Sequence, residues 1–130
     1  MACLVCTDGP DQGACFSLAA QKLVTVGRDD ACTFQLRDPH VSRRHLQVGR
    51  TADASSHFAA DYRTGNGTFV NGESIVGPRP LEDGDTVRIG TTTLVYSVDD
   101  YPDAETAMHQ VKQKGEWKRS TVLYRVPSGE

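Results

Sequence analysis

The segment Phe69-Val70-Asn71-Gly72-Glu73-Ser74-Ile75 carries the clearest structural signal in this chain of 130 residues. Asn-Gly between two extended runs favours a two-residue type I′ hairpin, because both central residues of that turn need positive φ. A second tight turn is expected at Asp83-Gly84-Asp85, before a strand that ends at Ile89. This part of the chain therefore predicts antiparallel strands joined by short turns.

The same pattern extends in both directions over residues 1 to about 98. Short apolar, β-branched runs alternate there with turn signals such as Gly9-Pro10, Asp38-Pro39 and Gly77-Pro78. Short strands at this regular spacing are typical of an all-β sandwich or barrel. The predicted strands include residues 4–5, 16–18, 23–26, 34–36, 46–48, 57–59, 68–70, 74–76, 86–89 and 93–98.

Residues 99–130 differ in character and are predicted to form a C-terminal extension of a domain at 1–98. Residues 104–114 contain good helix formers, with Asp103 as a candidate N-cap and Gly115 as a candidate stop. Residues 121–126 have a strand-like pattern. The extension is expected to pack on its own sandwich, on a second copy or on another molecule, and an exchange between two copies would give self-association.

Composition and charge exclude several classes of protein. The net charge is -3 at pH 7, which argues against nucleic-acid binding through overall charge. No apolar run approaches the roughly 20 residues needed to cross a bilayer. The first residues have neither the basic flank nor the apolar stretch of a secretory signal. We therefore predict a cytoplasmic protein with no nucleic-acid partner and no membrane partner.

The four cysteines do not form a pattern that predicts a metal site. Cys3 and Cys6 are three residues apart in a predicted strand, so their side chains are expected on opposite faces. No second ligand pair follows at zinc-site spacing. The cysteines are interpreted as small hydrophobic residues, and no metal and no cofactor are predicted.

Three loops hold the side chains that are suited to binding. They contain Gly27-Arg28, Ser42-Arg43-Arg44-His45 and Thr64-Gly65-Asn66-Gly67-Thr68, and each loop follows or precedes a predicted strand. Arginine presents a planar fork of donors that suits phosphate or carboxylate, and an asparagine side chain both donates and accepts hydrogen bonds. The set predicts a pocket for a dianion beside a clamp for a peptide, which matches a phosphorylated side chain.

An enzymatic interpretation of Ser42 and His45 has little support. No motif places an acidic third partner, and Ser42 is not on a Gly-x-Ser-x-Gly turn. No catalytic residue is predicted, and the chain is expected to be a binding protein rather than an enzyme.

Together these motifs resemble those of forkhead-associated (FHA) domains. The resemblance rests on Gly27-Arg28, Ser42-x-x-His45, Asn66-Gly67 and the stretch Leu81 to Gly90, in this order and spacing. It covers residues 2 to about 98. It implies an FHA-type β-sandwich of about eleven strands whose apical loops bind phosphothreonine peptides, followed here by a helix and strand-like tail.

The resemblance also implies roles for individual residues. Arg28 and Ser42 would hold the phosphate, with Arg43 as a second cation. Asn66 would bond the peptide main chain. Gly65 stands where relatives often have Ser or Thr, so only its backbone could contribute a bond.

Four further residues are assigned by the same resemblance. His40 lies two residues before Ser42, at a position that reads the peptide beyond the phosphothreonine in this family, and its preference stays open. His45 would support the Ser42 loop by bonding across loops. Gly27 and Gly67 would permit tight turns.

The function that the resemblance implies is a phosphothreonine-binding adaptor in Ser/Thr-kinase signalling. Its partner would be a Thr-phosphorylated protein, and a Ser/Thr kinase would act upstream. The alternative is a phosphate-independent scaffold or dimerisation module that uses the same fold, through a sheet face or through the tail.

Overall fold

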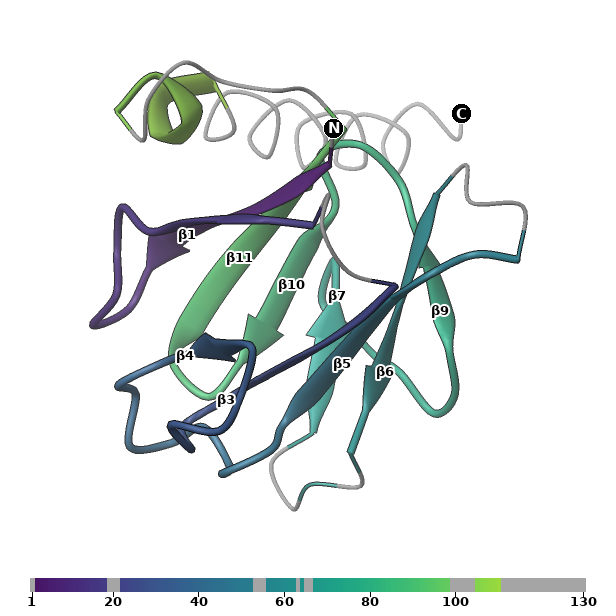
Figure 1. The fold of residues 1–130 in the computed structure, drawn as a ribbon, viewed down its shortest axis with the longest axis horizontal. Coiled ribbons are helices and arrows are strands. Elements are labelled where there is room, and N and C mark those ends of the chain that lie inside the picture. Colours follow the sequence, from purple (N-terminus) through teal and green to yellow (C-terminus); the bar gives the residue numbers. More distant parts are fainter. Residues whose placement is uncertain are drawn as a thin grey trace, which may run out of the picture.

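Two β-sheets pack face to face in the computed structural model (Figure 1), which describes residues 2–18, 22–52, 56–62, 64, 67–98 and 105–110. Eleven strands are present in these described residues, and the two sheets contain six and five of them. The predicted all-β sandwich is therefore confirmed. The apolar residues that face inward from both sheets form one buried cluster, which includes Leu4, Val26, Leu46 and Leu94.

The larger sheet has the strand order β2-β1-β11-β10-β7-β8, and its strands pair in antiparallel fashion. Its strands nearest the two ends of the chain, β1 and β11, lie side by side within the sheet. The strands are β1 (Cys3–Asp8), β2 (Cys15–Ser17), β7 (Thr68–Val70), β8 (Glu73–Ser74), β10 (Thr86–Ile89) and β11 (Thr92–Ser97).

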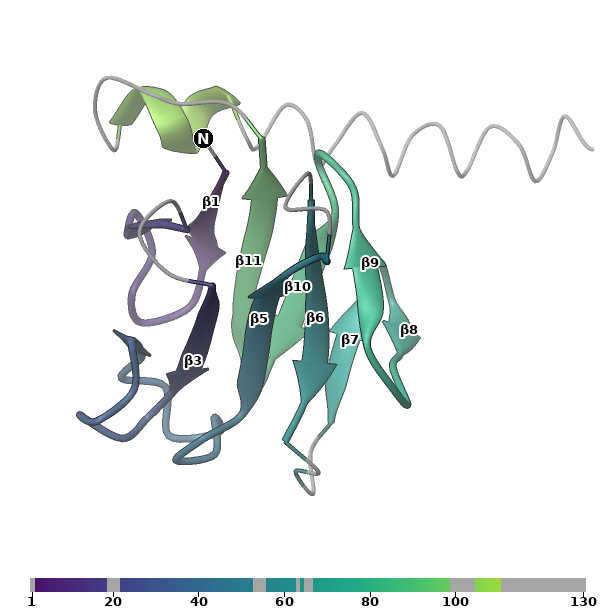
Figure 2. The same cartoon turned by 45° about the vertical axis from the view of Figure 1, so that its right-hand side comes forward.

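The smaller sheet has the order β4-β3-β5-β6-β9. Its β3/β4 pair is parallel, and the other pairs are antiparallel. Figure 2 shows this sheet in front of the larger one. The strands are β3 (Leu23–Gly27), β4 (Phe34–Gln35), β5 (Leu46–Arg50), β6 (His57–Asp61) and β9 (Arg79–Leu81).

The Asn-Gly hairpin forms as the sequence predicts. Asn71 and Gly72 have φ values of 52° and 85°, and Val70 pairs with Glu73 across the two-residue turn. The turn at Gly84 is confirmed as well, with φ of 88° at the glycine. The strand predicted at 74–76 is shorter, because β8 ends at Ser74 and the Val76 side chain is fully exposed.

One strand of the structure is not predicted by the sequence pattern. Residues Arg79–Leu81 form β9, although Pro78 and Pro80 indicate a turn or loop there. β9 is an edge strand that pairs only with β6. Proline lacks the N–H that an inner strand must donate on both sides, so it is tolerated at such an edge.

The described part of the tail packs on the chain's own sandwich. Residues 105–110 form a short helix, and Ala107 and Met108 cover Cys3, Val5 and Val95 on the outer face of β1 and β11. The helix prediction is confirmed for these six residues. Residue 104, residues 111–114 and the strand-like segment 121–126 lie outside the described residues.

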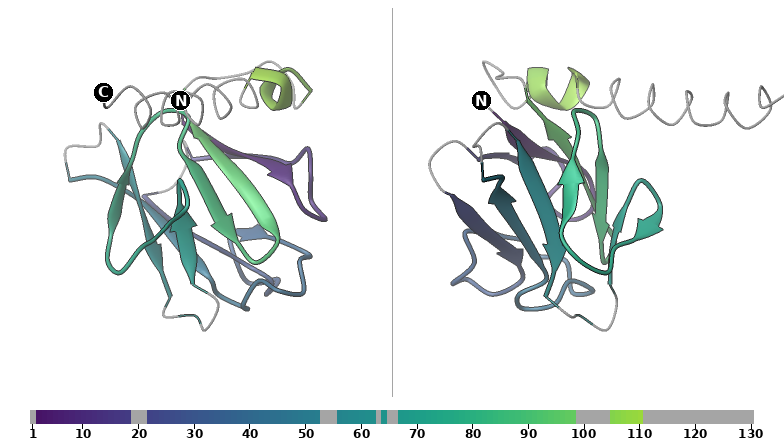
Figure 3. Two further views of the ribbon diagram at one scale, coloured as in Figure 1. Left: turned by 180° about the vertical axis from the view of Figure 1, so that it is seen from behind. Right: turned by 90° about the vertical axis from the view of Figure 1, so that its right-hand side faces the viewer.

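This contact explains why β1 is buried on both faces. Cys6 faces the interior of the sandwich and Cys3 faces the helix, as their spacing predicts. The helix lies at the end of the sandwich opposite the loops that follow β3 and β6 (Figure 3). None of the helices in the described ranges is long and apolar enough to span a membrane.

Candidate functional site

The three loops that the sequence singles out leave the sandwich at one end. β3 ends at Gly27, β5 begins after His45, and the turn between β6 and β7 spans residues 62–67. In Figure 2 these chain ends lie together at the bottom of the view, far from the short helix. We refer to this end as the apical end.

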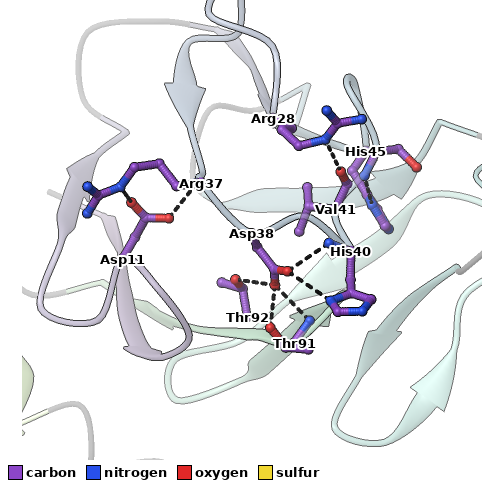
Figure 4. A network of polar contacts seen from close by, with 10 residues as sticks. Asp11, Arg28, Arg37, Asp38, His40, Val41, His45, Thr91 and Thr92 are labelled. Atoms are coloured by element: carbon purple, nitrogen blue, oxygen red, sulfur yellow. Dashed lines mark hydrogen bonds and ion pairs between the residues drawn. The ribbon is translucent and has the colours of Figure 1, made fainter.

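Arg28 is fixed against the Ser42 loop through both backbone and side chain. Its backbone N–H donates to the Ser42 carbonyl at 3.0 Å, and its Nε donates to the Val41 carbonyl at 3.0 Å (Figure 4). The side chain is exposed, and its two terminal nitrogens make no hydrogen bond with the described residues. The guanidinium is thus oriented by the fold while four N–H donors stay available.

Gly27 has no room for a side chain. A Cβ at this position would lie 2.2 Å from the Arg43 carbonyl oxygen and 2.8 Å from the Arg43 carbonyl carbon. The physical reason for glycine here is this close approach of the Ser42 loop to β3. Gly27 does not have a positive φ, whereas Gly67 does, with φ of 77°.

His45 is fully buried and connects two apical loops. Its Nδ1 accepts the Ser42 backbone N–H at 3.0 Å, and its Nε2 lies 2.7 Å from the Gly67 carbonyl oxygen. Because Nδ1 is an acceptor, the proton of the neutral ring is assigned to Nε2, which donates to Gly67. Both ring nitrogens are therefore occupied by the backbone of the two loops.

Asp61, at the end of β6, bonds described residues of the connection to β7. It accepts hydrogen bonds from the Thr64 N–H, the Thr64 hydroxyl and the Thr68 hydroxyl, at 2.7–2.9 Å. Burial alone would raise the pKa of Asp61, but these hydrogen bonds hold that pKa below its ordinary value. Thr64 and Thr68 are thus held by an ionised carboxylate.

Asp38 connects the loop that contains His40 and Ser42 to the turn between β10 and β11. Its buried carboxylate accepts hydrogen bonds from the Thr91 N–H and from the hydroxyls of Thr91 and Thr92, at 2.7–2.9 Å (Figure 4). It also accepts the His40 N–H at 2.9 Å, and the exposed His40 ring has its Nδ1 3.5 Å away. The β10–β11 turn therefore supports the Ser42 loop.

The ionised form of Asp38 is strongly favoured in the folded protein. Burial alone would raise the pKa of this carboxyl, but the bonds from Thr91, His40 and Thr92 outweigh burial and lower the pKa to about 2. Its ordinary value is 3.8. Since one pKa unit corresponds to about 1.4 kcal/mol, the ionised carboxylate contributes roughly 2 kcal/mol to folding.

Acid unfolding tests this contribution. A depressed folded-state pKa gives stability that is present above pH 4 and is lost as pH falls toward 2. We expect the free energy of unfolding of the parent chain to drop by roughly 2 kcal/mol more than that of Asp38→Asn over this range. Urea unfolding of both proteins at several pH values measures the difference, and equal losses would contradict the assignment.

Charged groups of both signs lie around Arg28 at the apical end. Arg43 and Arg44 are exposed, and Asp29 lies beside them with its N–H on the Arg43 carbonyl at 3.1 Å. The pKa of Asp29 is lowered, first by the Ala31 N–H and the Asp30 side chain, then by Arg44 and Arg43. The Ser42 hydroxyl makes no hydrogen bond with the described residues.

The structure brings most of the candidate residues together. Hydrogen bonds connect Arg28 to Ser42, and His45 to both Ser42 and Gly67. Gly27 lies against the Arg43 backbone, and His40 is on the neighbouring turn. Gly65 and Asn66 lie outside the described residues.

Sequence reasoning missed Asp38, Asp61 and Thr68 as supports of these loops. Each carries a common residue type in a turn or at a strand end, so no local pattern sets it apart. The role of Asp38 depends on Thr92, which is 54 residues away, whereas Asp61 bonds Thr64 and Thr68, three and seven residues away.

The arrangement defines a class of protein: a β-sandwich that presents preorganised arginine and serine donors at one end. No group of three metal-ligating side chains occurs among the described residues. The family model of the FHA domain matches residues 24–90, and the chain belongs to this family.

Relatives of this chain include proteins that contain an FHA domain as part of a longer chain. Mouse "Angiogenic factor with G patch and FHA domains 1" is 34% identical over 102 residues, which cover 72% of this chain. Those residues are 14% of the mouse protein, so the chain spans only a small part of that relative.

Solved FHA domains share the whole sandwich. One comes from a study of phosphothreonine-dependent FHA domain interactions and has 30% identity and a TM-score of 0.66. The match covers 77% of this chain and 98% of that one. The FhaA FHA domain, solved with the intracellular domain of Rv3910, has 31% identity and a TM-score of 0.65. The match covers 74% of this chain and 99% of that one.

Proposed function

We propose that this chain is a phosphothreonine-peptide-binding adaptor module in Ser/Thr-kinase signalling. The observation that carries the proposal is the fixed position of Arg28 beside the Ser42 loop, with its terminal N–H groups directed to no described residue. A phosphate of charge about -1.5 to -2 with three acceptor oxygens fits such a set of donors. A related FHA domain comes from a study of phosphothreonine-dependent interactions.

Arg28, Ser42 and Arg43 are the proposed phosphate ligands. Two guanidinium groups neutralise a dianion, and the Ser42 hydroxyl adds a neutral donor. Asn66, with the backbone of Gly65, is proposed to bond the peptide main chain. His40 is proposed to contact the peptide beyond the phosphothreonine, because its exposed ring is held beside the Ser42 loop by Asp38.

Binding without catalysis is part of the proposal. The His45 ring nitrogens already bond the Ser42 backbone N–H and the Gly67 carbonyl. His45 therefore has no nitrogen left to activate the Ser42 hydroxyl as a general base. The same two bonds suit a residue that holds the phosphate loop in shape.

A degenerate peptide library tests the function. We expect phosphothreonine peptides to bind in the micromolar range, phosphoserine peptides to bind more weakly, and unphosphorylated peptides not to bind. A preference for threonine would require an apolar contact for its γ-methyl group, and the library also reports which residue is preferred near His40. Fluorescence anisotropy with each peptide class measures this, and equal binding of phosphorylated and unphosphorylated peptides would refute the proposal.

The limits of the module are proposed as 1–98, with 99–130 as an extension. The pairing of β1 with β11 supports a module that spans residues 1–98, because both strands are needed to complete the larger sheet. The contact of Ala107 with β1 and β11 shows that part of the extension packs on this sheet. A cytoplasmic location and an upstream Ser/Thr kinase remain predictions.

The alternative scaffold function would act through self-association of the tail. The described helix packs on its own sandwich, so exchange between copies would require it to detach. A mass in light scattering that rises with protein concentration, together with no phosphopeptide binding, would favour the scaffold. A monomer at all concentrations would exclude its dimeric form.

A further inference from the structure

A half-buried histidine joins the two sheets at the end opposite the apical loops. His57 is the first residue of β6, and its Nδ1 lies 2.8 Å from the hydroxyl of Tyr96 on β11 in the other sheet. The two rings meet edge to face, with centroids 5.6 Å apart. Tyr96 is among the largest fully buried side chains of the molecule. This pair is a polar link between the two sheets.

The other ring nitrogen of His57 is left without a partner. Nε2 is buried and makes no hydrogen bond with the described residues. If Nδ1 carries the proton, it donates to Tyr96 and the Nε2 lone pair is unsatisfied. If Nε2 carries the proton, Tyr96 donates to Nδ1 and the Nε2 N–H is unsatisfied. In the protonated ring both nitrogens donate, so a buried charge would be added to an unsatisfied N–H.

The groups that face His57 do not favour a positive charge. Arg50 lies directly opposite on β5, and Leu81 lies opposite on β9. On β11 the neighbour is Tyr96, whose own surroundings include Asp83 and Asp85 from the β9–β10 loop and Cys3 from β1. Asp85 already accepts bonds from Asn71 and from the Glu82 N–H, and Asp83 accepts the Val98 N–H. Burial first, and then the charge of Arg50, lower the pKa of His57.

We propose that His57 and Tyr96 form a pH-sensitive clasp that holds the two sheets together when the imidazole is neutral and releases the β6–β9 edge on acidification. The ordinary pKa of histidine is 6.5. Between this value and the lower folded-state pKa, the unfolded chain binds the proton and the folded chain does not, so stability falls as pH falls. Above pH 6.5 the clasp contributes its full stability. One proton changes the unfolding equilibrium by at most about tenfold per pH unit.

Equilibrium unfolding between pH 8 and pH 5 tests the clasp. The variant His57→Gln keeps a polar side chain but does not titrate, and His109→Gln on the short helix is the matched control at an exposed histidine. Below pH 6.5 we expect the unfolding constant of the parent chain to rise by up to about tenfold per pH unit more than that of His57→Gln. His109→Gln should keep the slope of the parent chain. Equal slopes for the parent chain and His57→Gln would overturn the proposal.

A measurement on the unaltered chain covers the case in which His57→Gln does not fold. Imidazole NMR follows each histidine ring, and amide hydrogen exchange, corrected for the intrinsic effect of pH, follows β6 and β9. We expect the His57 ring to stay neutral below pH 6.5 and the β6–β9 amides to exchange faster as it becomes protonated. Protonation of His57 with unchanged exchange in these strands would overturn the proposal.

Discussion

Replacing Arg28 with alanine is expected to weaken phosphothreonine-peptide binding by about 10- to 150-fold, because a charge-assisted hydrogen bond contributes roughly 1.5–3 kcal/mol. The stability of the fold depends much less on the Arg28 side chain. It is exposed, and its one intramolecular bond among the described residues is from Nε to the Val41 carbonyl. The affinity should therefore fall while the free energy of unfolding changes by less than about 1 kcal/mol. Calorimetric titration of one phosphopeptide and urea unfolding measure the two quantities.

Two variants separate geometry from charge in this experiment. Arg28→Lys keeps the positive charge but loses the planar fork of donors, so its affinity should lie between those of the parent chain and Arg28→Ala. Arg79→Ala removes an arginine that pairs with Glu73 on the edge strands, away from the apical loops. It should leave the affinity unchanged. The proposed pocket would be refuted if Arg28→Ala bound as tightly as Arg79→Ala.

Replacing His45 with alanine is expected to lower the free energy of unfolding by at least about 4 kcal/mol. The substitution leaves a cavity in place of a fully buried ring, and such cavities alone cost at least about 2 kcal/mol. It also removes the partners of the Ser42 N–H and the Gly67 carbonyl, and each buried group left unsatisfied costs about 1–3 kcal/mol. The loss is large beside a typical domain stability of about 5–15 kcal/mol.

Two milder substitutions test the two ring nitrogens of His45 separately. The side-chain amide of Asn can take the place of Nδ1 toward Ser42, and that of Gln can take the place of Nε2 toward Gly67. Each should recover part of the stability, and His45→Asn should retain more phosphopeptide affinity because it keeps the Ser42 loop bonded. His109→Ala is the control at an exposed site. Unfolding energies that are equal for His45→Ala and His109→Ala would show that the loop bonds contribute nothing.

The two predictions together separate ligand groups from support groups at the apical end. Arg28 lies on the surface and is connected to the fold by few bonds, so its removal should affect binding alone. His45 lies beneath the surface between two loops, so its removal should affect folding first and binding as a consequence. A binding site of this kind needs both, because donors on flexible loops lose affinity to the entropy of ordering.

The strand and turn pattern was readable from the sequence because it depends on neighbouring residues. Asn71 and Gly72 both have positive φ, as an Asn-Gly pair favours in a two-residue hairpin, and alternating apolar residues fix which face of a strand is buried. The edge strand β9 was missed because Pro78 and Pro80 indicate a turn, and only the position at the edge of the sheet makes a strand possible there.

The sequence by itself determined the sandwich, its turns and the set of loops that contain Arg28, Ser42 and His45. Only the tertiary structure decided what holds those loops in place. Asp38 bonds Thr92, which is 54 positions away in the sequence. Glycine is required at position 27 because a Cβ there would lie 2.2 Å from the Arg43 carbonyl oxygen. The His57–Tyr96 link likewise joins residues 39 positions apart. Turns and strands follow from local dihedral preferences, whereas these contacts exist only after the two sheets and their loops have packed together.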